Sequence, residues 1–178
     1  LPVAEFEGPG QAMQHYLDHL PSACRQQIRE RGLSAGWALA CVIDGSDRME
    51  LTNNRWVFSR SEEVARFGLQ DLHLYNDFEA LAHALPTLGA EQLRSWDRRM
   101  PALHAPLAVI GPGTGLGVAA MVPTPSGWQA LSGEGGHATL APHDDFESEV
   151  LRLARREWPH VSAERLLSGI GLPLLHRC

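Results

Sequence analysis

The stretch GPGTGLG (111–117) lies between two apolar runs, LAVI (107–110) and VAAMV (118–122). It holds four glycines in seven residues. Glycine lets the backbone reach positive φ and come close to a ligand. The stretch is therefore interpreted either as a cradle for a phosphate group or as a sharp turn with nothing bound in it, and the residues alone leave both alternatives open.

The surrounding sequence excludes the two best-known nucleotide loops. A Walker A loop ends in a lysine, but every basic side chain of this sequence except histidine is an arginine. A dinucleotide-binding G-x-G-x-x-G opens a helix, whereas counting from Gly111 the third glycine slot is Leu116, and VAAMV is a poor helix opening. What remains is strand, glycine loop, strand, in which backbone N–H groups and the Thr114 hydroxyl can hold an anion.

Composition narrows the class of protein. The sequence has 178 residues, 44% of them hydrophobic, and a net charge of -6, which indicates one full domain or parts of two and argues against nonspecific nucleic-acid binding. Three widely spaced cysteines favour a reducing cytoplasm over a disulfide framework. No apolar run approaches the roughly 20 residues that span a membrane. Because the first residue is leucine and not methionine, we expect an excerpt of something longer.

Strand and helix patterns alternate, so the fold class is predicted as α/β or α+β. A helix is expected over 11–31 with a break near Pro21, and the S-x-x-E pattern at Ser59 predicts a capped helix through Phe67. Strands are predicted at 36–43, 56–58, 72–75, 106–111, 118–122 and 128–131. Further helices are predicted from 76 or 77 to 86, from 144 to 158 and from 162 to 167.

Five polar residues stand out by their setting. Asn76 and Asp77 follow an apolar strand, where ligands bind in α/β folds, although Asp77 is equally suited to capping a helix. Glu134 and His137 lie on a glycine-rich loop and suit a polyol ligand, or belong to a mobile surface loop. Glu164 is a candidate ligand or complements a helix dipole. The other histidines are interpreted as surface or capping groups, and no metal site is predicted.

Five motifs in order carry a resemblance to a family. They are TNNRWVFS (52–59), LYNDFEALAHALP (74–86), GPGTGLGVA (111–119), SGEGGHATLAP (132–142) and HVSAERLLSG (160–169). Together they resemble the bacterial glucokinases, which are ATP-dependent hexokinases of the actin-like superfamily. The resemblance implies an actin-like ATPase (ribonuclease H-like) two-domain sugar kinase fold, incomplete in this chain. It divides the chain into a partial small domain (1–86), an interdomain connection (87–104) and a partial large domain (105–178).

The resemblance also assigns roles and partners. Asp77 falls on the catalytic base that takes the proton of the sugar's 6-hydroxyl, and the glucose ligands fall on Asn76, Asp77, Glu134, His137 and Glu164. The ATP contacts, with Mg²⁺, fall on Gly111, Gly113, Thr114, Gly115 and Gly117. The implied activity is phosphorylation of D-glucose at the entry to glycolysis, by a cytoplasmic homodimer that binds neither nucleic acid nor membrane.

Two departures from the family are visible. The D-[IV]-G-G-T-N turn that holds the γ-phosphate and Mg²⁺ is not in this sequence, and ACVIDGSDRM (40–49) lacks the usual proline. We therefore expect these 178 residues alone to bind glucose weakly or not at all and not to phosphorylate it. Two alternatives stay open: a kinase for another hexose or an amino sugar, and a catalytically silent sugar-binding or regulatory protein.

Overall fold

The structure is a computed structural model that describes residues 5–51, 54–96, 102 and 104–178. The chain forms two compact units, Leu1–Asp77 and Phe78–Cys178, which are described separately. Part of the TNNRWVFS motif (52–53) and part of the expected connection (97–101 and 103) lie outside the described residues. The division into domains at 86 and 105 stays a prediction.

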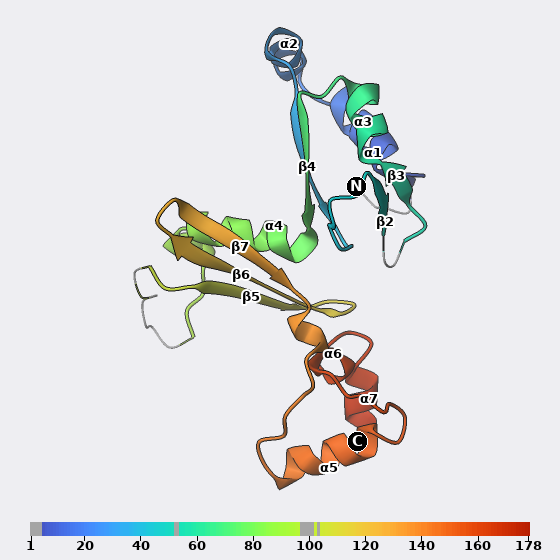
Figure 1. Ribbon diagram of the computed structural model, residues 1–178, viewed down its shortest axis with the longest axis vertical. Helices are drawn as coiled ribbons and strands as arrows, with labels where there is room; N and C mark the ends of the chain where they lie inside the picture. Colours follow the sequence, from blue (N-terminus) through green and yellow to red (C-terminus); the bar gives the residue numbers. More distant parts are fainter. Residues whose placement is uncertain (1–4, 52–53, 97–101, 103) are drawn as a thin grey trace. The chain divides into compact units, whose positions relative to one another are not determined.

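The first unit contains a parallel strand pair (Figure 1). β1 (Ser34–Leu39) pairs with β4 (Asp71–Asn76) in a register that sets Leu39 opposite Asn76. A parallel pair needs a crossover, which here consists of the antiparallel strands β2 (Arg48–Glu50) and β3 (Val57–Ser59) and the helix α3 (Arg60–Phe67). The expected strand over 36–43 ends early, at Leu39, because β4 ends at Asn76 and offers no further partner.

Local signals fix the helices of this unit. The helix expected over 11–31 is broken as predicted, into α1 (Pro9–Asp18) and α2 (Ser22–Arg31), with Pro21 at the residue before α2. The hydroxyl of Ser59 accepts a hydrogen bond from the Glu62 N–H at 3.1 Å, so the predicted cap of α3 is confirmed. Gly68 ends α3 in the left-handed conformation, with φ of 59°, which glycine adopts without steric cost.

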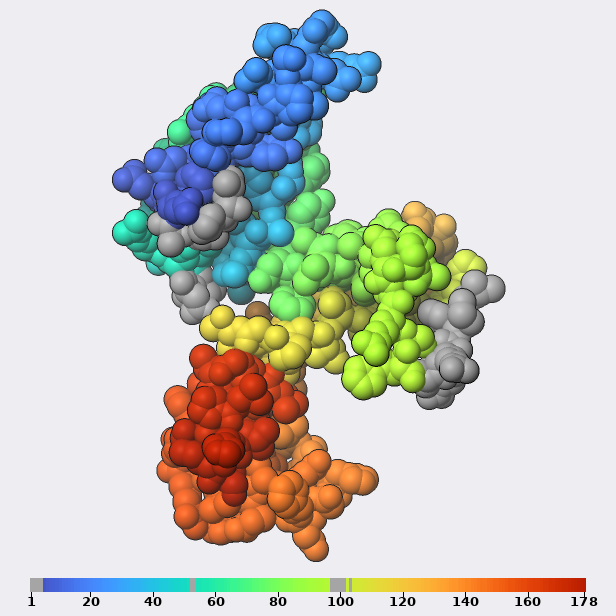
Figure 2. Space-filling view, turned by 180° about the vertical axis from the view of Figure 1, so that it is seen from behind, coloured from blue at the N-terminus to red at the C-terminus, as the bar shows by residue number. Residues whose placement is uncertain are grey.

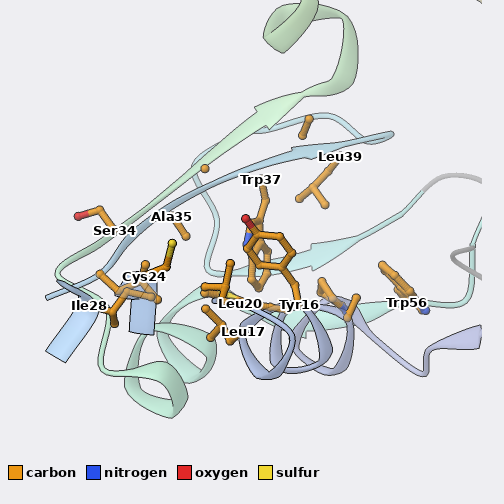
Figure 3. Close-up of a pocket in the computed structure, with 16 residues that line it drawn as sticks. Tyr16, Leu17, Leu20, Cys24, Ile28, Ser34, Ala35, Trp37, Leu39 and Trp56 are labelled. Atoms are coloured by element: carbon orange, nitrogen blue, oxygen red, sulfur yellow. The ribbon is translucent and has the colours of Figure 1, made fainter. Parts of the chain in front are cut away.

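An apolar groove of about 690 Å³ lies between the first two helices and β1. Figure 3 shows Tyr16 and Leu20 on its helical side and Trp37 and Leu39 on β1. The side chains of Leu39, Cys41, Met49 and Phe58 form a buried cluster, and Trp37 packs against it. Trp37 and Leu39 are two residues apart and so lie on the same face of β1. They both line the groove and contact this cluster.

Glu63 is a buried carboxyl in α3, with only 9% of the residue exposed. Its Oε2 has no hydrogen-bond partner among the described residues, and the nearest cation, Arg66, lies 3.9 Å from Oε1. Burial is the main cause that raises the pKa of Glu63 above 4.5; Arg66 opposes the rise and Glu62 adds to it. The charged form of Glu63 therefore destabilises the folded state.

Glu63→Gln is expected to stabilise the protein near neutral pH. Because the pKa is higher in the folded state, the free energy of unfolding of the wild type falls as the pH rises from the ordinary carboxyl value to the raised one. Urea unfolding at about pH 4 and about pH 7 measures the difference. Glu50→Gln, at an exposed position of β2, is the control. Equal pH dependence in wild type and Glu63→Gln would contradict the expected penalty.

The second unit begins with α4 and a three-stranded antiparallel sheet (Figure 1). α4 (Asp77–Ala84) starts at the last residue of the first unit, and two short 3-10 turns follow, Leu85–Thr87 and Ala90–Gln92. The strands are β5 (Leu107–Pro112), β6 (Leu116–Thr124) and β7 (Gly127–Gly133), in that order. Ala82 of α4 packs with Ala119 and Met121 of β6 in a buried cluster, so α4 covers one face of this sheet.

Three helices follow the sheet and gather in one group, orange to red in Figure 2. They are α5 (Asp145–Ala154), α6 (Ala163–Leu166) and α7 (Leu172–Arg177), preceded by a 3-10 turn η4 (Gly135–His137). Their core contains Val150, Leu151, Ala154, Val161, Leu166 and Leu174.

The ends of these helices depart in part from the predicted ones. Asp144 accepts the Glu147 N–H at 2.8 Å, which confirms the predicted cap of α5, and Ser162 caps α6. The helix expected to reach Trp158 ends at Ala154 and continues as turns, and α7 was not predicted. No helix in the described ranges combines the length and the apolar character that crossing a bilayer requires.

Candidate functional site

The glycine loop joins two antiparallel strands, as the sequence predicts. Gly111 of β5 lies opposite Gly117 of β6, and Pro112 lies opposite Leu116. At the tip, the Gly113 N–H donates to the Gly115 carbonyl at 2.8 Å. The loop is thus a hairpin end, and no helix opens behind it.

The positions of this loop require glycine for different structural reasons. A Cβ on Gly111 or Gly117 would collide with the ring of Phe78 from α4, so these two glycines make room for packing. Gly113 faces open space, and Thr114 is exposed beside it. For the N–H groups of Thr114 and Gly115 the described part of the chain offers no hydrogen-bond acceptor. At the tip, two amides and a hydroxyl thus lack a hydrogen-bond partner within the described ranges.

Three of the predicted sugar ligands lie together in the second unit. His137 Nδ1 is 2.9 Å from Glu134 Oε2, and His137 Nε2 is 3.2 Å from Glu164 Oε1. The imidazole and the Glu134 carboxylate are largely exposed, with 59% and 69% of their side-chain surface accessible, whereas Glu164 is 19% exposed. The three side chains thus form a row of hydrogen-bonding groups, in which Glu134 and His137 are exposed and Glu164 is largely buried.

Backbone contacts bring these residues together across the sequence. The Leu140 N–H donates to the Val161 carbonyl and the Ala163 N–H to the Ala138 carbonyl, both at 3.1 Å. These bonds hold the loop after His137 against the start of α6. At Gly136 a Cβ would collide with the Leu116 carbonyl, so a glycine is needed there. The glycines of SGEGGHATLAP thus allow the close approach to β6 that positions His137.

Glu164 also contacts the glycine loop, which the sequence did not predict. Its Oε2 accepts the Leu116 N–H at 2.9 Å, and the Gly169 N–H donates to the Gly113 carbonyl at 2.7 Å. The side chain thus bonds to a distant loop, in addition to standing in the first turn of a short helix. The motif order was the only signal available, since 48 residues separate Glu164 from Leu116.

Asn76 and Asp77 lie at the end of β4, in the first unit. Asn76 Nδ2 donates to the Cys41 carbonyl at 3.2 Å, which orients the side-chain amide. Asp77 is the first residue of α4. Burial, and then the charges of Asp77 and Asp44, raise the pKa of the Cys41 thiol. Sequence reasoning did not single out Cys41, which nevertheless supports Asn76.

Potential metal ligands do not cluster in the described part of the chain. It contains no group of three or more His, Cys, Asp or Glu side chains that could hold a metal ion. His15 and His19, four residues apart on α1 and at its end, stack with ring centroids 4.2 Å apart. The pair has the H-x-x-x-H spacing, which was not expected among the remaining histidines.

A family model for glucokinase matches residues 1–178. The chain belongs to the glucokinase family. Its curated relatives include the glucokinase of Paramagnetospirillum magneticum, 44% identical over 99% of this chain and 53% of the relative. Another is the glucokinase of Chromobacterium violaceum, 51% identical over 90% of this chain and 46% of the relative. The chain thus spans about half the length of the curated glucokinases it matches.

Solved glucokinases share the fold. A glucokinase from an Antarctic psychrotroph superposes with a TM-score of 0.82 at 36% identity, over 99% of this chain and 52% of that chain. The glucokinase of Balamuthia mandrillaris, solved in complex with glucose, has a TM-score of 0.59 at 18% identity, over 91% of this chain and 51% of its own. The predicted α/β fold of the actin-like ATPase type is confirmed by these matches.

Proposed function

We propose that this glucokinase-family chain takes part in the ATP-dependent phosphorylation of D-glucose at the 6-hydroxyl. One observation carries the proposal beyond family membership: Glu134, His137 and Glu164 form a connected group, and Glu164 bonds directly to the glycine loop. A row of polyol-binding groups beside a hairpin tip with available amides is the arrangement that a sugar kinase needs. No observation favours the other-sugar or silent alternatives.

Glu134, His137 and Glu164 are proposed to bind the sugar hydroxyls. Carboxylates accept hydrogen bonds from hydroxyls, and the imidazole can donate or accept at either nitrogen. His137 Nδ1 forms a hydrogen bond with Glu134, and Nε2 lies 3.2 Å from Glu164 Oε1, so the imidazole stands between the two carboxylates. A sugar lacking one of the matching hydroxyls leaves such groups unpaired, and this discriminates strongly against it.

Asp77 is proposed as the general base, with Asn76 as a neighbouring sugar ligand. A carboxylate within reach of the attacking hydroxyl takes up its proton as the oxygen attacks, which typically contributes about 10²–10⁴-fold to the rate. The bond from Asn76 Nδ2 to the Cys41 carbonyl supports this assignment because it holds the end of β4 in one conformation.

The tip of the glycine loop is proposed to hold phosphate oxygens of ATP. The residues fit an anion: Gly113 leaves open space, and the amides of Thr114 and Gly115 and the Thr114 hydroxyl point to no acceptor in the described ranges. Mg²⁺ is usually bound in kinases by one or two carboxylates together with substrate phosphates, so a dedicated cluster of protein ligands is not required. ATP supplies the phosphoryl group, and Mg²⁺ neutralises its charge.

The proposed function also includes a cellular location and an oligomeric state. All three cysteines are free thiols, and Cys41 is buried. Free cysteines are usual in a reducing cytoplasm. We propose that the protein works there as a homodimer, with glucose and ATP as its substrates.

Steady-state kinetics with a panel of sugars tests the proposed substrate. The complete reading frame that contains this chain is assayed with glucose, mannose, fructose and N-acetylglucosamine, each with ATP and Mg²⁺. We expect the highest kcat/KM for glucose. A higher kcat/KM for another sugar would replace glucose as the substrate, and no turnover with any sugar would support a silent protein.

A further inference from the structure

Glu164 uses both of its carboxylate oxygens within the second unit. Oε1 faces His137 Nε2 at 3.2 Å, and Oε2 accepts the Leu116 N–H at 2.9 Å. Because four-fifths of the Glu164 side chain is buried, water competes little for its bond to the Leu116 N–H. One carboxylate thus joins the loop that carries His137 to the loop that is proposed to hold ATP.

The Leu116 amide depends on this carboxylate. In an antiparallel pair, hydrogen-bonded and non-hydrogen-bonded residue pairs alternate. The bond from the Gly113 N–H to the Gly115 carbonyl shows that Gly113 and Gly115 form a hydrogen-bonded pair. The next pair, Pro112 with Leu116, is therefore a non-hydrogen-bonded pair. The Leu116 N–H therefore points away from β5, toward Glu164. Its acceptor within the described part of the chain is Glu164 Oε2.

The segment after Glu164 holds the glycine loop at a second point, and the loop packs closely against the Glu164 carboxylate. The Gly169 N–H bonds the Gly113 carbonyl at 2.7 Å, so the segment 164–169 contacts the hairpin on both sides of its tip. A Cβ on Gly115 would run into the Glu164 carboxylate, whereas a Cβ on Gly113 would meet nothing within 4 Å. The contact with Glu164 thus requires glycine at 115 but not at 113.

We propose that Glu164 is a positioning residue for the glycine loop and couples sugar binding to nucleotide binding. This inference rests on the proposed function, since it takes His137 and Glu164 as sugar ligands and the hairpin tip as the ATP loop. Sugar hydroxyls that bond to Glu164 fix the carboxylate, and the carboxylate fixes Leu116 and with it the amides of Thr114 and Gly115. By linkage, nucleotide then raises the affinity for sugar by the same factor as sugar raises the affinity for nucleotide.

Hydrogen exchange at the Leu116 amide tests the structural half of this proposal in the chain alone. In Gly115→Ala the amide is expected to exchange about 10- to 100-fold faster than in the wild type, the factor associated with losing a hydrogen bond to a charged acceptor. Gly113→Ala makes the same change two residues away in open space and is expected to leave the exchange unchanged. Equal exchange rates in the two variants would overturn the proposal.

Two substitutions of Glu164 separate its acceptor from its charge. Glu164→Gln keeps an oxygen for the Leu116 N–H and presents its amide nitrogen to His137, so the slow exchange is expected to be retained. Glu164→Ala removes the acceptor and is expected to exchange as fast as Gly115→Ala. Slow exchange in Glu164→Ala would show that another group holds the loop and would overturn the proposal.

Equilibrium binding tests the coupling itself in the complete reading frame. The dissociation constant for glucose is measured with and without saturating ADP and Mg²⁺. Coupling of this kind amounts to about 5- to 150-fold. We expect a ratio in that range for the wild type and for Gly8→Ala, whose added Cβ meets nothing within 4 Å, and a ratio near one for Gly115→Ala. A wild type that binds no glucose would refute the proposed function, whereas a ratio that is one in the wild type or is unaffected by Gly115→Ala would overturn the coupling alone.

Discussion

Asp77→Asn is expected to lower kcat for glucose phosphorylation by about 10²–10⁴-fold, the usual contribution of a general base. Asparagine has nearly the same shape as aspartate and still forms hydrogen bonds, but it cannot take the proton of the 6-hydroxyl. Glucose binding is therefore expected to stay largely intact. The measurement pairs steady-state kcat with an equilibrium dissociation constant for glucose, so that loss of chemistry is separated from loss of binding.

Asp71→Asn provides a matched control at the other end of β4. Asp71 is 45% exposed and pairs with Arg60 at 3.3 Å and with His73, and such exposed pairs contribute little. This variant is expected to keep both kcat and glucose affinity. If Asp77→Asn kept a kcat close to that of the wild type, the assignment of Asp77 as the base would be wrong.

Leu151→Ala is expected to lower the free energy of unfolding by about 2–5 kcal/mol, as is typical of leucine-to-alanine changes in a core. Leu151 is 1% exposed and packs in the cluster that joins α5 to α6 and α7. Because Leu166 of α6 belongs to the same cluster and stands two residues after Glu164, the loss also weakens the anchor of the candidate site. Urea unfolding of the chain measures the effect.

Leu172→Ala is the control for this core substitution. Leu172 is 58% exposed at the start of α7, and exposed substitutions usually change stability by no more than about 0.5 kcal/mol. If Leu151→Ala and Leu172→Ala were equally mild, the three C-terminal helices would not share the core that the structure gives them.

Features set by neighbouring residues could be predicted from the sequence. The break at Pro21 and the caps at Ser59 and Asp144 depend on residues within one helical turn, and the structure confirms them. The strands on both sides of GPGTGLG were predicted because β-branched residues follow the loop and no lysine is available for a Walker motif. The fold class came from the order of five motifs, and the family match bears it out.

Features set by distant partners could not be predicted. β1 ends at Leu39 because β4 supplies no partner beyond Asn76, and nothing in the sequence of β1 marks that point. The packing of Phe78 against Gly111 and Gly117 and the bond between Glu164 and Leu116 both join residues that are far apart in the chain. The glycines of the loop looked alike in the sequence, yet two of them make room for a ring and a third for a carboxylate. The roles of Asp77, Asn76, Glu134 and His137 stay predictions.

The most direct test of the glucokinase assignment is ³¹P NMR of the reaction of glucose with ATP and Mg²⁺, catalysed by the complete reading frame. We predict one new sugar phosphate, glucose 6-phosphate, formed in equal amount to ADP, and no such product with Asp77→Asn over the same time. Release of inorganic phosphate without a sugar phosphate, or phosphate on another hydroxyl, would contradict the account.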